Sequence, residues 1–231
     1  MRASAAGVAK MICVGTSSQD SKEAVEIADK HQVLYAAVGI HPHESQGGYD
    51  TIAELLEQGP TERTVAVGEI GLDYFYTHSS REQQIAALEG QLQLAHDHNL
   101  PVIFHVREAF DDFWPIYDNF HPRGVLHSFT DSQQNADAAM GRGLFIGVNG
   151  ISTFTRDERQ RSMFAGLPLD SLLLETDAPF LTPVPLRGTI NEPALVEKVA
   201  EFHANLRRIT IEEVALRTTT NAHALFTRLN T

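Results

Sequence analysis

Short apolar runs rich in β-branched residues recur along the chain, and longer segments with helical spacing separate them. Runs of this kind predict strands that are buried on both faces, and helices between them predict a parallel sheet. Seven strands are expected, at Met11–Val14, Leu34–Val38, Val65–Glu69, Val102–Val106, Val125–His127, Phe145–Val148 and Leu172–Glu175. A closed barrel and a doubly wound open sheet both fit this alternation.

The intervening segments predict helices, for instance at Asp20–Lys30, Arg81–Asn99 and Asp131–Arg142. Ser79 with Glu82, and Thr210 with Glu213, have the spacing of a capping box, in which two side chains satisfy backbone N–H groups at the start of a helix.

Polar residues at the ends of the predicted strands favour the barrel. They are His41 and His43, Glu69, His105 with Arg107, His127, Asn149 and Asp177. In a TIM barrel the carboxyl ends of all strands meet at one mouth, where the loops build the active site, whereas an open sheet has no such mouth. The sequence therefore predicts an α/β fold of the TIM (β/α) barrel type.

The composition fits one soluble domain over residues 1–231. A hydrophobic fraction of 42% and a charged fraction of 21% exclude a disordered chain, and the absence of a long apolar stretch excludes a membrane protein. No signal peptide is recognised, so a cytoplasmic location is expected. Cys13 is the only cysteine, so any metal site must use His, Asp and Glu.

The net charge of -12 argues against a broad basic surface for nucleic acid. Divalent cations held by carboxylates can nevertheless attract a phosphodiester locally.

Glu69, His105 and Arg107 carry candidate chemistry on two neighbouring strands. A strand-end glutamate between glycines suits a ligand that bridges two cations, although it could also face solvent or pair with a base. His105 and Arg107 share one strand face, where an imidazole can bind metal and a guanidinium can hold a phosphate. The alternatives are a core histidine and a surface ion pair.

Later segments add further candidates. His127 could join His105 on one ion, although a lone histidine in an apolar run is more often structural. Asp177 can bind metal and orient or deprotonate water, with Glu175 in support, unless it only caps the turn before Pro179.

His41 and His43 flank Pro42, which interrupts a regular strand, so substrate contact is favoured over a metal pair. The remaining histidines, His203 among them, fall in helical or loop patterns and are expected to be solvated.

The segments GIHPH, GEIGLDY, FHVRE, HSF, LLLETDAPFL and RGTINEP, taken in order, resemble the TatD family of metal-dependent deoxyribonucleases over nearly the whole chain. The resemblance implies a distorted TIM barrel, two divalent metal ions, and 3′ to 5′ cleavage of DNA phosphodiester bonds. By position it implies catalytic roles for Glu69 and Asp177, metal ligation by Glu69, His105, His127 and Asp177, and substrate binding by Arg107, His41, His43 and Asn191.

One departure from the family pattern is expected to matter. The family opens with a strand that carries a His-x-His pair, and no such pair precedes Met11. We therefore expect seven of eight barrel strands in this chain and one weakened metal site. A late start codon or a truncated gene model is the simplest explanation.

Several alternatives stay open at this level. Mg or Mn suits the carboxylates, while the histidines also permit Zn. The negative charge favours short or single-stranded DNA as the partner, and the oligomeric state is unknown. A hydrolase of another ester or amide bond, and a non-catalytic remnant that binds nucleic acid or protein, are the competing hypotheses.

Overall fold

The computed structural model describes residues 2–58 and 62–230. These fall into two compact units. The first unit comprises Lys10–Gly124 with Leu225–Thr231, and the second comprises Met1–Ala9 with Val125–Ala224, each within the described residues.

Within the described residues seven strands form, each at a predicted position. They are β1 (Met11–Val14), β2 (Leu34–Val38), β3 (Thr64–Asp73), β4 (Val102–Arg107), β5 (Gly124–Leu126), β6 (Phe145–Val148) and β7 (Leu172–Leu174). In the first unit β1 to β4 pair in chain order and in parallel, and in the second unit β5 to β7 do the same. This parallel (β/α) alternation confirms the predicted TIM-type fold class.

Helices connect the strands within each unit. The first unit contains α2 (Ser18–Lys30), η1 (Pro42–Gly47), α3 (Asp50–Glu57), α4 (Arg81–Asp97), α5 (Phe110–Phe120) and η4 (Thr227–Asn230). The second contains α1 (Arg2–Ala5), α6 (Gln133–Gly141), α7 (Ile151–Phe154), α8 (Glu158–Gly166), η2 (Leu169–Ser171), η3 (Pro193–Leu195), α9 (Val196–Arg207) and nearly all of α10 (Ile211–Leu225). Within the described ranges, no helix has the length and hydropathy that crossing a bilayer requires.

One of the two bonds of the predicted capping box forms at one helix, and the box is shifted by one residue at another. The backbone N–H of Glu213 donates to Thr210 Oγ1, as predicted for the start of α10. At α4 the capping box uses Ser80 and Gln83 instead of Ser79 and Glu82. The reason is tertiary, because the Ser79 hydroxyl donates to the carbonyl of His43 at 3.0 Å and so leaves the cap to its neighbour.

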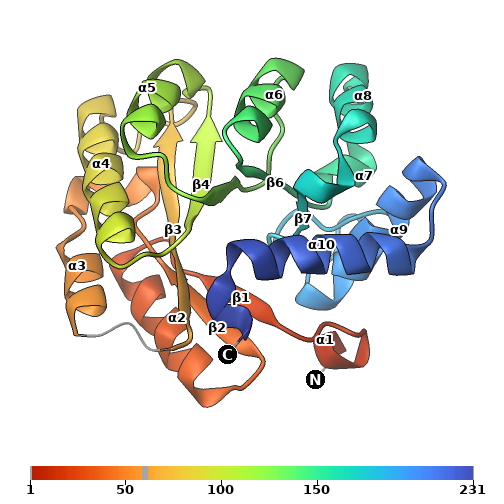
Figure 1. The fold of residues 1–231 in the computed structure, drawn as a ribbon, viewed down its shortest axis with the longest axis horizontal. Coiled ribbons are helices and arrows are strands. Elements are labelled where there is room, and N and C mark those ends of the chain that lie inside the picture. The colour runs from red at the N-terminus through yellow and green to blue at the C-terminus, as the bar shows by residue number, and fades with distance from the viewer. Residues whose placement is uncertain (1, 59–61, 231) are drawn as a thin grey trace. The chain divides into compact units, whose positions relative to one another are not determined.

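β3 is the central element of the first unit, and all ten of its residues are buried. α4 lies along β3, and α5 lies beside β4 (Figure 1). The register pairs Gly71 with His105 and Asp73 with Arg107. The polar residues at the ends of β3 and β4 therefore stand on two tightly packed strands.

Candidate metal and catalytic site

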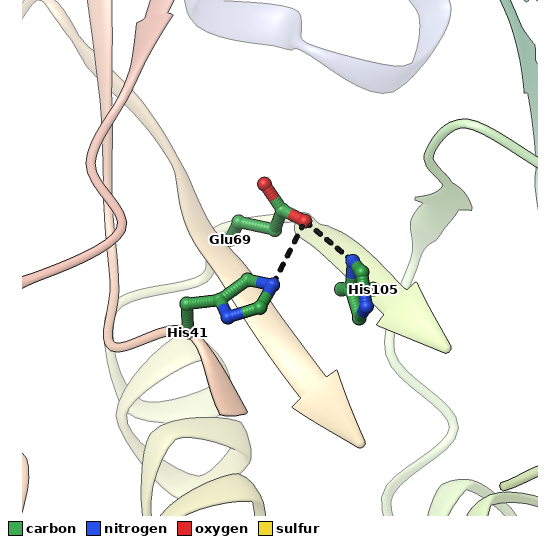
Figure 2. A group of neighbouring side chains, drawn as sticks. All are labelled: His41, Glu69 and His105. Atoms are coloured by element: carbon green, nitrogen blue, oxygen red, sulfur yellow. Dashed lines mark hydrogen bonds and ion pairs between the residues drawn. The ribbon is translucent and has the colours of Figure 1, made fainter. Parts of the chain in front are cut away.

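Imidazoles and carboxylates gather in the first unit where β2, β3 and β4 end. His41 lies between β2 and η1, Glu69 lies in β3 and His105 lies in β4, and the three side chains point toward one another (Figure 2). Glu69 Oε1 is 2.9 Å from His105 Nδ1 and 3.7 Å from His41 Nε2. One ligand-type atom from each residue lies within 4.8 Å of the others. Two nitrogens and a carboxylate at this spacing fit a divalent transition metal.

Asp73 belongs to the same cluster, and the sequence reasoning assigned it no role. Its Oδ2 lies 2.8 Å from His105 Nε2 and 3.1 Å from the buried His43 Nε2, which makes no hydrogen bond in the described part of the chain. Burial raises the pKa of Asp73, but the hydrogen bonds from His105 and from the backbone N–H of Tyr76 outweigh it and hold the pKa below its ordinary value. Asp73 is therefore an ionised, buried carboxylate.

A sequence signal for Asp73 existed. Glu69, Gly71 and Asp73 are spaced two residues apart, so they share one face wherever the strand is regular. The prediction ended the strand at Glu69, whereas β3 continues to Asp73.

His41 has a preferred tautomer. The backbone N–H of His43 donates to His41 Nδ1 at 3.1 Å, so a neutral ring carries its proton on Nε2, the atom that faces Glu69. Burial, and after it the neighbouring His105, lower the pKa of His41 to about 3. Near neutral pH His41 is thus an uncharged donor at Nε2. Direct metal ligation through Nε2 would require the ring to give up the bond from His43.

Two buried glutamines of α4 hold the backbone beside these residues. Gln91 accepts from the N–H of Ile40 at 2.7 Å and donates to its carbonyl at 3.2 Å. Gln84 forms the same pair of bonds with Asp73, at 2.8 and 3.0 Å. Their seven-residue spacing places both on one helix face, a pattern that sequence reasoning could have flagged as polar residues facing the core.

Arg107 lies at the end of β4 with its guanidinium 3.9 Å from the centre of the Phe75 ring and 5.2 Å from that of Tyr76. Its guanidinium makes no hydrogen bond to the residues that the structure describes. Stacking orients the planar group and leaves its N–H edges available for an anion. Phosphate binding by Arg107 stays a prediction.

The second unit contains a carboxylate–imidazole–carboxylate arrangement built on β5 and β7. His127 Nδ1 lies 3.0 Å from Glu175 Oε1, and that oxygen also accepts from the backbone N–H of Ser128 at 2.7 Å and from Asn149 Nδ2 at 3.3 Å. His127 Nε2 lies 4.0 Å from Asp177 Oδ1. A carboxylate on Nδ1 fixes the proton there and directs Nε2 outward as a ligand atom. Two atoms each about 2.1 Å from one ion can be up to about 4.2 Å apart, so His127 and Asp177 can share a metal.

Asn191 holds the loop that carries Asp177. It is 3% exposed, and its amide Nδ2 donates to the carbonyls of Thr176 at 2.7 Å and Phe180 at 2.6 Å. Asp177 adopts a left-handed conformation with φ of 58° inside this loop. Asn191 therefore stabilises the loop on both sides of Asp177. Contact between Asn191 and substrate stays a prediction.

The predicted site residues thus form two groups. The first unit brings together Glu69, His105, His41 and His43, and Arg107 follows His105 by two residues at the end of β4. The second unit brings together His127 and Asp177 and places Asn191 under the Asp177 loop.

We expect Glu175→Gln to weaken metal binding by about 10- to 100-fold, because the neutral amide no longer fixes the tautomer of His127 or raises its basicity. Calorimetric titration with Mn²⁺ measures this. Glu158→Gln, which removes an exposed carboxylate from α8, is the matched control and should leave the affinity unchanged. Equal affinities in both variants would contradict a supporting role for Glu175.

His203 corrects the expectation that the remaining histidines are solvated. It lies on the inner face of α9, fully buried, where its Nε2 is 3.0 Å from Ser152 Oγ and its Nδ1 is 2.7 Å from the Arg207 guanidinium. Ser152 Oγ in turn donates to the carbonyl of Asn149, whose side chain contacts Glu175. A buried polar chain therefore runs from α9 to the residues behind His127.

We predict that His203 makes folding pH-dependent. Burial, and then Arg207, lower its pKa to about 3, whereas in the unfolded chain it titrates near its ordinary value of about 6.5. Between these values the unfolded state binds the extra proton, so the free energy of unfolding falls as the pH falls from about 6.5 toward 3. Urea unfolding followed by circular dichroism should show a shallower pH slope for His203→Gln. The exposed His96→Gln should match the wild type, and identical slopes for all three proteins would refute the prediction.

The chain is similar to known proteins of one family. Residues 1–227 match the model of TatD related DNase. The chain is 36% identical to the uncharacterized metal-dependent hydrolase YabD of Bacillus subtilis, covering 99% of this chain and 91% of that protein. It is also 36% identical to the 3'-5' ssDNA/RNA exonuclease TatD of Erwinia amylovora, covering 97% of this chain and 91% of that one.

A solved structure agrees with this match. The TatD homologue YjjV from Escherichia coli superimposes with a TM-score of 0.91 and is 36% identical, and the alignment covers 98% of this chain and 89% of that one. The family model and the relatives each extend over nearly the whole chain, so this protein belongs to the TatD-related DNase family.

Proposed function

We propose that the protein is a metal-dependent phosphodiesterase that removes nucleotides from the 3′ end of single-stranded DNA. The observation that carries the proposal is the clustering of Glu69, His105 and His41 in one group of potential ligands. The names of the relatives support it, because some are called 3'-5' ssDNA/RNA exonuclease and others metal-dependent hydrolase.

The residues present fit divalent metal ions. Glu69 and His105 in the first unit, and His127 and Asp177 in the second unit, would be the ligands. When bound, divalent ions would supply a water nucleophile near neutral pH and would compensate charge on the phosphate. The carboxylates favour Mg or Mn, and the imidazoles also permit Zn.

The candidate site residues of each unit have distinct proposed roles. Asp177 orients the attacking water and accepts its proton, and Glu175 supports the site through His127. His41, neutral and protonated on Nε2, donates to a phosphate oxygen, and Arg107 holds the phosphate with its free N–H edges. His43 borders the same cluster through its contact with Asp73.

The overall charge bears on the substrate. With a net charge of -12, the surface repels a long duplex, so binding depends on the local site. A short or single strand that meets the protein only at this site is therefore the favoured substrate.

Nucleotide release from 5′-labelled single-stranded DNA tests the proposal. We expect a ladder of products shortened from the 3′ end with Mg²⁺ or Mn²⁺, no products in the presence of a chelator, and slower cleavage of a blunt duplex of the same sequence. Release that persists in the chelator, or a folded protein that releases nothing with any of Mg²⁺, Mn²⁺ and Zn²⁺, would refute it.

A further inference from the structure

Two large aromatic side chains are exposed immediately after β3. Phe75 is 48% exposed and Tyr76 is 43% exposed, although the strand that precedes them is buried throughout. Thr77 and His78, which follow, are exposed as well. This exposure leaves apolar ring surface in contact with water beside a group of potential metal ligands.

The exposed rings connect to the metal cluster through a series of ring contacts. The ring centre of Tyr76 lies 5.3 Å from that of His43, which lies 4.4 Å from His41, which in turn lies 4.4 Å from His105. His78 packs against both Tyr76 and His43, at 5.7 and 4.8 Å. A continuous series of ring contacts therefore leads from the exposed rings to His41 and His105, which both contact Glu69.

Arg107 lies beside the two exposed rings. It is exposed, its guanidinium lies over the Phe75 ring, and its N–H edges make no hydrogen bond within the described residues. Aromatic faces and a guanidinium plane stack on nucleobases, while guanidinium N–H groups pair with phosphate oxygens. A single nucleotide contains both a nucleobase and a phosphate.

The backbone under the exposed rings is held in place. Asp73 Oδ1 accepts from the N–H groups of Phe75 at 3.0 Å and Tyr76 at 3.1 Å. Gln84 Nε2 donates to the carbonyl of Ser79 at 3.2 Å, and the Ser79 hydroxyl donates to His43. Because the segment is anchored at both ends, the backbone that carries the rings loses little conformational freedom when a ligand stacks on them.

We propose that Phe75, Tyr76 and Arg107 form a stacking platform for a nucleobase of a single-stranded substrate. The platform rests on the proposed nuclease function and deepens it, since it binds the base while the cluster at Glu69 acts on the phosphate. Every base has a π face, so the platform accepts all bases and requires that they be unpaired. A patch that instead docks a protein would not distinguish base-bearing from abasic strands.

Binding of a short oligothymidylate and of an abasic strand of the same length tests the platform. Fluorescence anisotropy at low ionic strength, with metal chelated to prevent cleavage, compares the wild type with the Phe75→Ala/Tyr76→Ala double variant. We expect the wild type to prefer the base-bearing strand by about tenfold, in the range of one stacked base. The double variant should lose this preference, and Tyr76→Phe should keep it because the ring remains.

Leu216→Ala, which removes an exposed apolar side chain from α10, is the control and should keep the preference. Nucleotide release with Mn²⁺, measured on the same proteins, should show a raised KM and a little-changed kcat for the double variant. A double variant that still prefers the base-bearing strand overturns the platform, while metal-dependent release by the wild type would leave the nuclease function standing. A wild type that neither binds nor cleaves either strand overturns both proposals.

Discussion

Glu69→Ala is expected to abolish metal-dependent nucleotide release, lowering kcat/KM by roughly 10³-fold or more. Glu69 Oε1 is the atom that faces both His41 and His105, so its loss removes the carboxylate from the centre of the cluster. Removing one preorganised catalytic group commonly costs about 10²- to 10³-fold, and a carboxylate that contacts two imidazoles also positions them.

A thermal unfolding measurement and a control variant separate this effect from misfolding. Mn²⁺ should raise the unfolding temperature of the wild type, since a ligand that binds only the folded state stabilises it, and should raise that of Glu69→Ala much less. Glu89→Ala removes an exposed carboxylate from α4 and should retain both activity and stabilisation. Wild-type release by a folded Glu69→Ala protein would rule out a central role for Glu69.

Gly71→Ala is expected to have the largest effect on stability, at roughly 3 kcal/mol or more. Gly71 has a φ of 152°, which side chains rarely adopt, and a Cβ there would lie 1.8 Å from the carbonyl oxygen of His105. The neighbour is backbone of the paired strand, so relief requires β3 and β4 to separate. Backbone strain and overpacking each cost about 1–3 kcal/mol, and both apply here.

Gly141→Ala is the matched control. Gly141 is the last residue of α6, and a Cβ built there meets no atom within 4 Å. Alanine in a helix is favourable relative to glycine by up to about 1 kcal/mol, so this variant should be neutral or slightly stabilised. Urea unfolding of both variants measures the free energy of unfolding. Equal values for the two variants would show that β3 and β4 accommodate the added methyl group.

The strand predictions show where sequence reasoning works. β1, β2 and β6 have the predicted bounds, because each is a short apolar run that ends at polar or turn residues. β3 extends four residues beyond its predicted end at Glu69, through Asp73. This last part of β3 contains the buried, charged Asp73, which pairs with His105. A search for apolar runs does not recognise a strand whose polar residues are buried and hydrogen-bonded.

The site predictions divide in the same way. The positions of Glu69, His105 and Asp177 after apolar runs identified them as candidates without any structure. Their partners were not visible, since the pairs Glu69 with His105, Asp73 with His105 and Glu175 with His127 are 36, 32 and 48 residues apart.

The sequence by itself determined the parallel (β/α) fold class, because strand burial and helix spacing follow from the pattern of neighbouring positions, and it proposed the candidate site residues. Only the tertiary structure decided which imidazole nitrogen bears a proton and which histidine is buried. His41 donates through Nε2 because the His43 backbone occupies Nδ1, and His203 is uncharged because α9 packs it against Arg207 and Ser152. Such states depend on desolvation and on hydrogen bonds that exist only after distant segments have packed.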